Sequence, residues 1–208
     1  HFGNYIAALK PAIAASQTQK TFMFIADLHA LNSIHDAKII REHTYQAAAL
    51  LISLGLNLEN AILFRQSDID EIYQLNTLLM NVTPKGLMNR AHSYKAAMDK
   101  NTANGEDIDA GVNMGLYTYP ILMTADILLY NSDIVPVGAD QKQHVEFARD
   151  IAGYFNKTFG ETFKLPTPVI GRDTGLIPGL DGRKMSKSYD NTIPLMAPEK
   201  ELKKKIMR

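Results

Sequence analysis

The sequence has 208 residues, of which 46% are hydrophobic, enough for one substantial core and therefore for one domain with or without a small insertion. Its 22 basic and 22 acidic residues cancel, which excludes a global field that would draw the chain to nucleic acid or to an acidic membrane. The absence of cysteine excludes disulfides, thiolate metal sites and a cysteine nucleophile, and it fits a cytoplasmic location. We expect no signal peptide, because no charged n-region followed by an apolar run opens the sequence. We expect no membrane partner, because the longest apolar stretch, 115–130, is shorter than the roughly 20 residues that cross a bilayer.

The predicted elements alternate between strands and helices. Short apolar runs ending in polar residues predict strands at 21–27, 61–65 and 133–137, the first of them covered on both faces. Helical spacing of apolar residues predicts helices over 36–54, with Gly55 as its C-terminal stop, over 69–80 and over 141–155. The stretch 115–130 reads as a buried helix. This alternation predicts an α/β fold with a doubly wound parallel sheet, whose ligands lie beyond the carboxyl ends of the strands.

Two regions interrupt the alternation. The segment 100–107 is polar with little apolar anchoring, which predicts a mobile surface loop. The segment 166–188 is rich in proline and glycine, which predicts an irregular and functional loop.

The end of the second region carries a group of cations. Arg183, Lys184 and Lys187 alternate with Ser186 and Ser188, and no acidic residue stands among them. Lysine is a compact charge that can follow phosphate oxygens, and serine hydroxyls can donate to the same oxygens. The pattern therefore favours an anionic ligand, with a solvated basic loop as the alternative.

Residues 184–188, Lys-Met-Ser-Lys-Ser, match the KMSKS signature of class I aminoacyl-tRNA synthetases at every position. This resemblance implies that Lys184 and Lys187 are catalytic, and that Lys187 above all stabilises pyrophosphate and the charge that develops at the α-phosphate of ATP. It also implies an ATP site that includes Leu176, Lys184, Met185, Ser186, Lys187 and Ser188.

The first residues, His1-Phe-Gly-Asn4, resemble the HIGH signature in the form found in tryptophan and tyrosine enzymes. Gly3 would let adenine approach the backbone, and a helix N-terminus at His1 and Asn4 would favour phosphate. The resemblance implies catalytic roles for His1 and Asn4 and ATP contacts for Gly3 and Asn4. The alternative is a terminal histidine without a role.

A third segment follows the predicted strand at 133–137. It resembles the stretch of tryptophan enzymes that contacts the ATP ribose, which implies this role for Gly138, Ala139 and Asp140 and places Gln141 near the amino-acid substrate. His144 has no metal partner at a suitable spacing, so we expect a hydrogen-bonded helix residue and no protein-bound metal.

Asp126 is the one carboxylate in the apolar helix predicted over 115–130. Burying it without a partner is costly, so it either bonds to a neighbouring backbone group or accepts a hydrogen bond from a ligand. An indole N–H is such a donor. The segment resembles the helix in which tryptophan enzymes bind indole. This implies that Tyr119, Met123 and His29 frame the ring, although a methionine at helical spacing is usually a core residue.

Together these motifs identify the sequence as similar to the bacterial-type tryptophanyl-tRNA synthetases, with a Rossmann-like α/β fold. The resemblance implies that L-tryptophan and Mg-ATP give tryptophanyl-AMP and pyrophosphate, that the amino acid is then transferred to tRNA(Trp), and that the protein is a homodimer. Three alternatives stay open: a tyrosyl-tRNA synthetase, a nucleotidyltransferase that needs no amino acid, and a non-catalytic tryptophan-binding paralogue.

The resemblance also implies a division of the chain. Residues 1–197 would form the catalytic domain, without its first strand and with a helical insertion at about 67–130. Residues 198–208 would begin a helical anticodon-binding domain that is otherwise absent.

Overall fold

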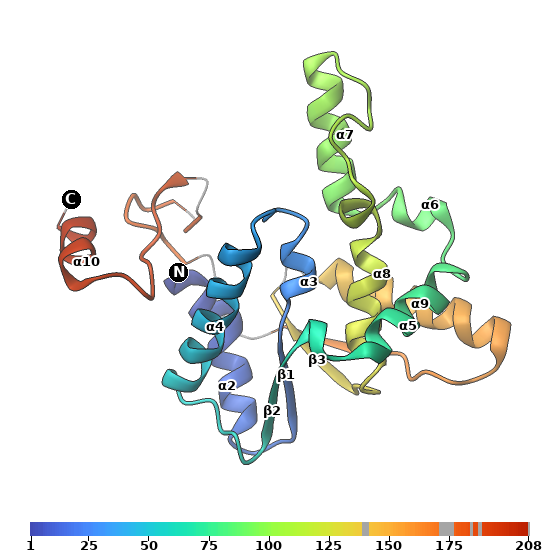
Figure 1. Ribbon diagram of the computed structural model, residues 1–208, viewed down its shortest axis with the longest axis horizontal. Helices are drawn as coiled ribbons and strands as arrows, with labels where there is room; N and C mark the ends of the chain where they lie inside the picture. Colours follow the sequence, from blue (N-terminus) through green and yellow to red (C-terminus); the bar gives the residue numbers. More distant parts are fainter. Residues whose placement is uncertain (139–141, 171–176, 184, 187–188, 208) are drawn as a thin grey trace.

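Figure 1 shows the computed structural model, which describes residues 1–138, 142–170, 177–183, 185–186 and 189–207. The elements in chain order are α1 (Phe2–Asn4), the π-helix η1 (Tyr5–Leu9), α2 (Lys10–Ser16), β1 (Thr21–Ile25), α3 (Asp27–Ala30), α4 (Ala37–Ser53), β2 (Ala61–Arg65), the 3-10 helix η2 (Gln66–Asp68), α5 (Asp70–Met80), α6 (Lys85–Met88), α7 (His92–Asn104), α8 (Met114–Leu128), β3 (Ile134–Val137), α9 (Lys142–Phe159), β4 (Thr167–Ile170) and α10 (Glu199–Ile206).

The strands are parallel and alternate with helices, as the sequence predicts. In the described part of the chain they are hydrogen-bonded as two pairs, β1 with β2 and β3 with β4. The pair β3–β4 corrects one expectation, because the segment 166–188 begins with a strand and not with irregular chain. Pro168 lies in β4 opposite Val135. Proline has no N–H to donate to a neighbouring strand, so it occurs in sheets only where that donor is not needed. Because proline is uncommon in strands, the composition of this segment resembles that of a loop.

The two faces of β1 are covered by different parts of the chain. Met23 and Ile25 pack against the small core that Ile13 of α2 and Leu51 of α4 help to form. On the other face, Phe22 stacks on the ring of Tyr130, with 4.9 Å between the ring centroids. This cover is incomplete, since Phe22 remains 38% exposed, so the expectation of a strand covered on both faces holds only in part.

Helix α4 begins and ends where the sequence predicts. The Asp36 carboxylate accepts hydrogen bonds from the N–H groups of Lys38 and Ile39, which satisfies two donors of the first turn. Gly55 follows the helix with a φ of 93°, a conformation that glycine adopts without steric cost.

A second and larger core lies among the helices after β2. Leu79 of α5, Ile121 and Ala125 of α8, and Ile151 of α9 are buried together there, and Figure 1 shows these three helices gathered beside the strands. The buried helix predicted over 115–130 is therefore confirmed as α8. Because Ala125 faces this core, the next residue, Asp126, is turned by about 100° toward the strands.

Helix α7 corrects the prediction of a loop over 100–107. The helix continues to Asn104 and ends at Gly105, whose φ is 71°. The Asn101 side chain is buried and donates to the carbonyl oxygens of Ile108 and Ala110, at 3.1 and 2.8 Å. In Figure 1 α7 projects away from the other helices, so most of its surface meets solvent and its sequence is polar for that reason.

Candidate functional site

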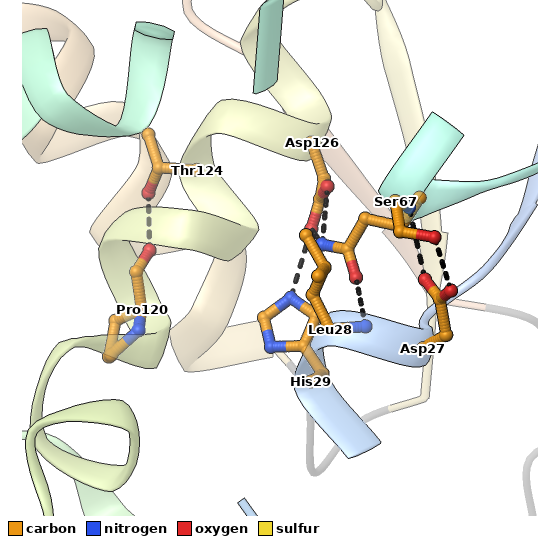
Figure 2. A network of polar contacts seen from close by, with 8 residues as sticks. Asp27, Leu28, His29, Ser67, Pro120, Thr124 and Asp126 are labelled. Atoms are coloured by element: carbon orange, nitrogen blue, oxygen red, sulfur yellow. Dashed lines mark hydrogen bonds and ion pairs between the residues drawn. The ribbon is translucent and has the colours of Figure 1, made fainter. Parts of the chain in front are cut away.

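Asp126 lies in the last turns of α8, facing the carboxyl ends of β1 and β2. It is 4% exposed, yet its carboxylate has partners. The Nε2 atom of His29 is 2.9 Å from Oδ2, and the Gln66 side-chain nitrogen donates to Oδ1 and Oδ2 at 2.8 and 2.9 Å. Figure 2 shows His29 and Asp126 pointing toward each other from α3 and α8. The neighbouring backbone group that the sequence offered as the alternative partner is not what binds this carboxylate.

Three hydrogen bonds in both directions join the ends of β1 and β2 beside this carboxylate. The backbone N–H of Leu28 donates to Oε1 of Gln66 at 3.2 Å. In return, the backbone N–H of Ser67 donates to Oδ1 of Asp27 at 3.0 Å, and the Ser67 hydroxyl donates to Oδ2 at 2.5 Å (Figure 2). Each strand end thus supplies a side-chain acceptor to the backbone of the other, which sets the spacing between them.

Tyr119 lies two turns before Asp126 on α8, at the other side of His29. The rings of Tyr119 and His29 meet edge to face, with centroids 6.4 Å apart. The Tyr119 hydroxyl is 2.8 Å from Nε2 of His144 on α9 and accepts from the Ser93 hydroxyl at 3.2 Å. His144 is therefore hydrogen-bonded within a helix, as predicted.

The predicted indole-binding residues Asp126, His29 and Tyr119 thus form one contiguous group. Met123 is half-buried on the same helix, and its role as a ring contact stays a prediction. Burial and the nearby charge of Asp126 raise the pKa of Tyr130, at the end of the same segment, to about 12.

The two signature motifs also meet in the structure, although they stand at opposite ends of the sequence. The Gly3 N–H donates to the sulfur of Met185 at 3.2 Å, and Met185 is only 6% exposed. A Cβ at residue 3 would stand 3.1 Å from the His1 ring and 3.3 Å from that sulfur, so glycine permits this approach. Asn4 donates its N–H to the His1 ring, whose side chain caps the helix. A cavity of about 380 Å³ opens beside His1, lined also by His43 of α4 and by Met196.

Asn191, which is 3% exposed, joins Asp181 and Ser186. Its side-chain oxygen accepts from the Ser186 N–H at 2.8 Å, and its nitrogen donates to Asp181 at 2.7 Å. These bonds, first that of Asn191 and then those of Arg183, hold the pKa of the Asp181 carboxyl below its usual value. Arg183 is therefore engaged with Asp181 through its side chain at 2.7 Å and is not simply a free cation of the loop.

Several predicted site residues lie outside the described part of the chain: Ala139, Asp140, Gln141, Leu176, Lys184, Lys187 and Ser188. Gly138 is described and follows β3 directly, half-buried, as expected.

Sequence reasoning missed Gln66, Ser67 and Asn191. Gln66 and Ser67 follow β2 directly, at the same edge as Asp27 and His29, so the rule that ligands gather at the carboxyl ends of parallel strands could have found them. Nothing in the sequence around Asn191 indicates its role.

Within the described ranges, no three His, Asp or Glu side chains gather in a way that could bind a metal ion. No helix in the same ranges is both long enough and apolar enough to span a membrane.

The fold and the paired motifs define a class of protein. A family model described as class I tRNA synthetases (W and Y) matches residues 1–208. The chain therefore belongs to this family of class I tRNA synthetases.

Within the family, the chain is similar to particular proteins. It is 53% identical over 209 residues to the tryptophan–tRNA ligase of Neisseria meningitidis, covering 99% of this chain and 62% of the relative. It is 54% identical over 213 residues to that of Pseudomonas aeruginosa, covering 100% of this chain and 48% of the relative. The chain thus spans about half to three fifths of the length of these relatives.

Among solved structures, the chain resembles the tryptophanyl-tRNA synthetase of Campylobacter jejuni complexed with ADP and tryptophan. The TM-score is 0.88 with 45% sequence identity, and the match covers 100% of this chain and 62% of that one.

Proposed function

We propose that the chain is the catalytic part of a tryptophan–tRNA ligase, which activates L-tryptophan with ATP and transfers it to tRNA(Trp) in the cytoplasm. The observation that carries the proposal is the Asp126 carboxylate, 4% exposed and bound by donors from two other elements. Such a buried acceptor suits the indole N–H, which can only donate. The similarity to tryptophan–tRNA ligases and to a structure that binds tryptophan and ADP supports the same substrates.

The same acceptor favours tryptophan over phenylalanine and other rings without a donor. A site built around a hydrogen bond rejects an analogue that lacks it by about 10⁴- to 10⁵-fold, because the polar group of the site is left unpaired. Tyr119, Met123 and His29 are the residues that we assign to the ring, and Gln141 to the amino-acid end of the substrate.

In the proposed first step, a carboxylate oxygen of tryptophan attacks the α-phosphorus of Mg-ATP. The bond from that phosphorus to the oxygen bridging to the β-phosphate breaks, and pyrophosphate leaves with the electron pair. No general base is required, because an α-carboxyl group with a pKa of about 3.5 is ionised at neutral pH. The work is positioning and charge stabilisation, which we assign to His1, Asn4, Lys184 and Lys187. The backbone at Gly3, Gly138, Ala139 and Asp140, with Leu176, Met185, Ser186 and Ser188, completes the proposed ATP site.

A homodimer is also proposed, with α5 in its interface. Two large apolar side chains lie two turns apart on one face of this helix and are exposed: Tyr73 at 44% and Met80 at 41%. A second copy of the protein would remove them from water.

The experiment that tests the function is ATP–pyrophosphate exchange by the complete protein, with tryptophan, with tyrosine and with no amino acid. We expect exchange with tryptophan alone. Exchange with tyrosine alone would make the protein a tyrosine enzyme. An adenylylated product formed without any amino acid would make it a different nucleotidyltransferase, and tryptophan binding without exchange would make it a non-catalytic paralogue.

Lys187→Ala separates catalysis from binding in the same assay. A donor directed at charge that develops in the transition state is worth about 10²- to 10³-fold in kcat, so we expect a loss of this size with a small change in the KM for ATP. A raised KM for ATP with an unchanged kcat would remove Lys187 from the proposed catalytic role.

A further inference from the structure

Gln66 is a completely buried polar side chain beside the candidate amino-acid site. It is 0% exposed and opens η2, directly after β2. Its side chain touches two other parts of the chain, the backbone of α3 at Leu28 and the carboxylate of Asp126 on α8. Burying an amide costs free energy unless its polar atoms are hydrogen-bonded, and these contacts provide such bonds for both the oxygen and the nitrogen.

We propose that Gln66 is a positioning residue for tryptophan recognition: its amide fixes the ionised Asp126 carboxylate so that Oδ1 keeps an acceptor position for the indole N–H. The inference rests on the proposed function and extends it, because Gln66 itself would not touch the substrate.

The orientation of the amide follows from its surroundings. The Leu28 N–H can only donate, so the atom of Gln66 that faces it at 3.2 Å must be the oxygen. The nitrogen is then the atom 2.8 and 2.9 Å from the Asp126 oxygens. The reversed amide would place an oxygen against a carboxylate and leave the Leu28 N–H facing a second donor. Both errors are costly in a buried place, so one orientation is enforced.

The two oxygens of the Asp126 carboxylate differ in their number of hydrogen-bond partners. An ionised carboxylate offers about four acceptor positions on its two oxygens. In the described part of the chain, Oδ2 has two partners, Gln66 and His29, whereas Oδ1 has Gln66 alone. Because an ionised carboxylate cannot donate, Nε2 of His29 carries the proton in this bond. A further donor is therefore directed to Oδ1.

A neutral amide is suited to this task. An arginine in its place would pair with both oxygens and cancel the charge of the carboxylate. The glutamine fixes the carboxylate and leaves its charge available to the indole N–H. The reciprocal bonds between Asp27, Leu28, Gln66 and Ser67 fix the amide in turn, because they attach it to the ends of both strands.

The test uses Gln66→Met in the complete protein, with kcat and KM measured for tryptophan and for β-(3-benzothienyl)alanine, in which sulfur replaces the ring N–H. A hydrogen bond to a charged group is worth about ten- to a hundredfold in binding, so we expect kcat/KM for tryptophan to fall by that factor, mainly through KM. The value for the analogue should change by less than threefold, so that discrimination between the two substrates collapses. Gln19→Met, at an exposed position between α2 and β1, is the matched control and should leave both values unchanged.

Two further variants complete the design. Gln66→Asn keeps the amide but is one methylene too short to reach Leu28 and Asp126 together, so it should reproduce the loss if the methionine variant does not fold. In a double-mutant cycle with Asp126→Asn, the effect of Gln66→Met on discrimination should vanish, because Gln66 acts through Asp126.

Equal losses for tryptophan and the analogue, or discrimination retained in a folded Gln66 variant, would overturn the inference while leaving the proposed function intact. Absence of tryptophan-dependent exchange in the unmodified protein would instead overturn the proposed function.

Discussion

Gly179 lies against Asn191, with no space between them for a side chain. A Cβ built on it would stand 2.3 and 2.4 Å from the Asn191 side chain and 2.7 Å from its backbone oxygen. Asn191 bonds to Ser186 and Asp181, so any side chain at residue 179 would displace the residue that makes both of these hydrogen bonds.

We therefore predict that Gly179→Ala lowers the free energy of unfolding by about 1–3 kcal/mol, the usual cost of overpacking. Thermal melting of the complete protein measures the change. Gly153→Ala is the control, because residue 153 lies inside α9 and a Cβ built on it would have nothing within 4 Å. This variant should be more stable than the unmodified protein by about 0.5–1 kcal/mol. Similar melting temperatures for the two variants would contradict the steric argument.

At the scale of the element, α7 depends on polar contacts more than on a hydrophobic face. Tyr94 is its most buried aromatic residue and donates its hydroxyl to Asp109 at 2.7 Å. Asn101 ties the end of the helix to the turn that leads toward α8. A helix that projects from the molecule, as α7 does in Figure 1, has few apolar contacts to define its end, so these hydrogen bonds define it.

Asn101→Ala removes the donor that bonds to two carbonyl groups, and we predict that the free energy of unfolding falls by about 1–3 kcal/mol. Hydrogen exchange should rise first at the amides of 101–112, because the substitution frees that turn before it affects the core. Asn104→Ala, at an exposed position in the same last turn, should leave both the stability and the exchange pattern nearly unchanged. Uniform exchange across the protein in the Asn101 variant would show that the turn is not opened locally.

The pKa of Tyr94 makes the stability of α7 depend on pH. Its hydrogen bond to Asp109, then burial, raise the pKa of the hydroxyl from its usual 10.0 to about 12. A raised pKa in the folded state means that the contribution to stability is complete below pH 10 and is lost as the pH rises through about 12. Tyr94→Phe should therefore lower the melting temperature at pH 8, and the difference from the unmodified protein should shrink toward pH 12. A constant difference over this range would refute the assignment.

At the scale of the whole molecule, the proposed homodimer predicts a change of assembly. Met80→Lys places a charge on the face of α5 that also carries the exposed Tyr73, and burying an unpaired charge is unfavourable. We expect the dissociation constant measured by sedimentation velocity to rise at least tenfold. Leu58→Lys, at a residue 54% exposed outside α5, should leave the dimer unchanged. Equal dissociation constants for the two variants would show that α5 does not lie in the interface.

Much of the protein could be predicted from its sequence because the responsible interactions are local. The cap of α4 needs only Asp36 and the residues that follow it, and the strands β1 and β2 need only their apolar runs. The end of α7 is not predictable in this way, because its sequence is polar and the hydrogen bonds of Asn101 that define it reach across the following turn.

The candidate site divides in the same way. The sequence alone determined the family, because the residues at 184–188 and 1–4 are recognisable as residue types at fixed spacings, and it singled out Asp126 as a candidate site residue. Only the tertiary structure decided what surrounds Asp126, since its partners Gln66 and His29 are separated from it by 60 and 97 residues. Hydrogen bonds over such separations depend on how strands and helices pack, and no local pattern in the sequence encodes that packing.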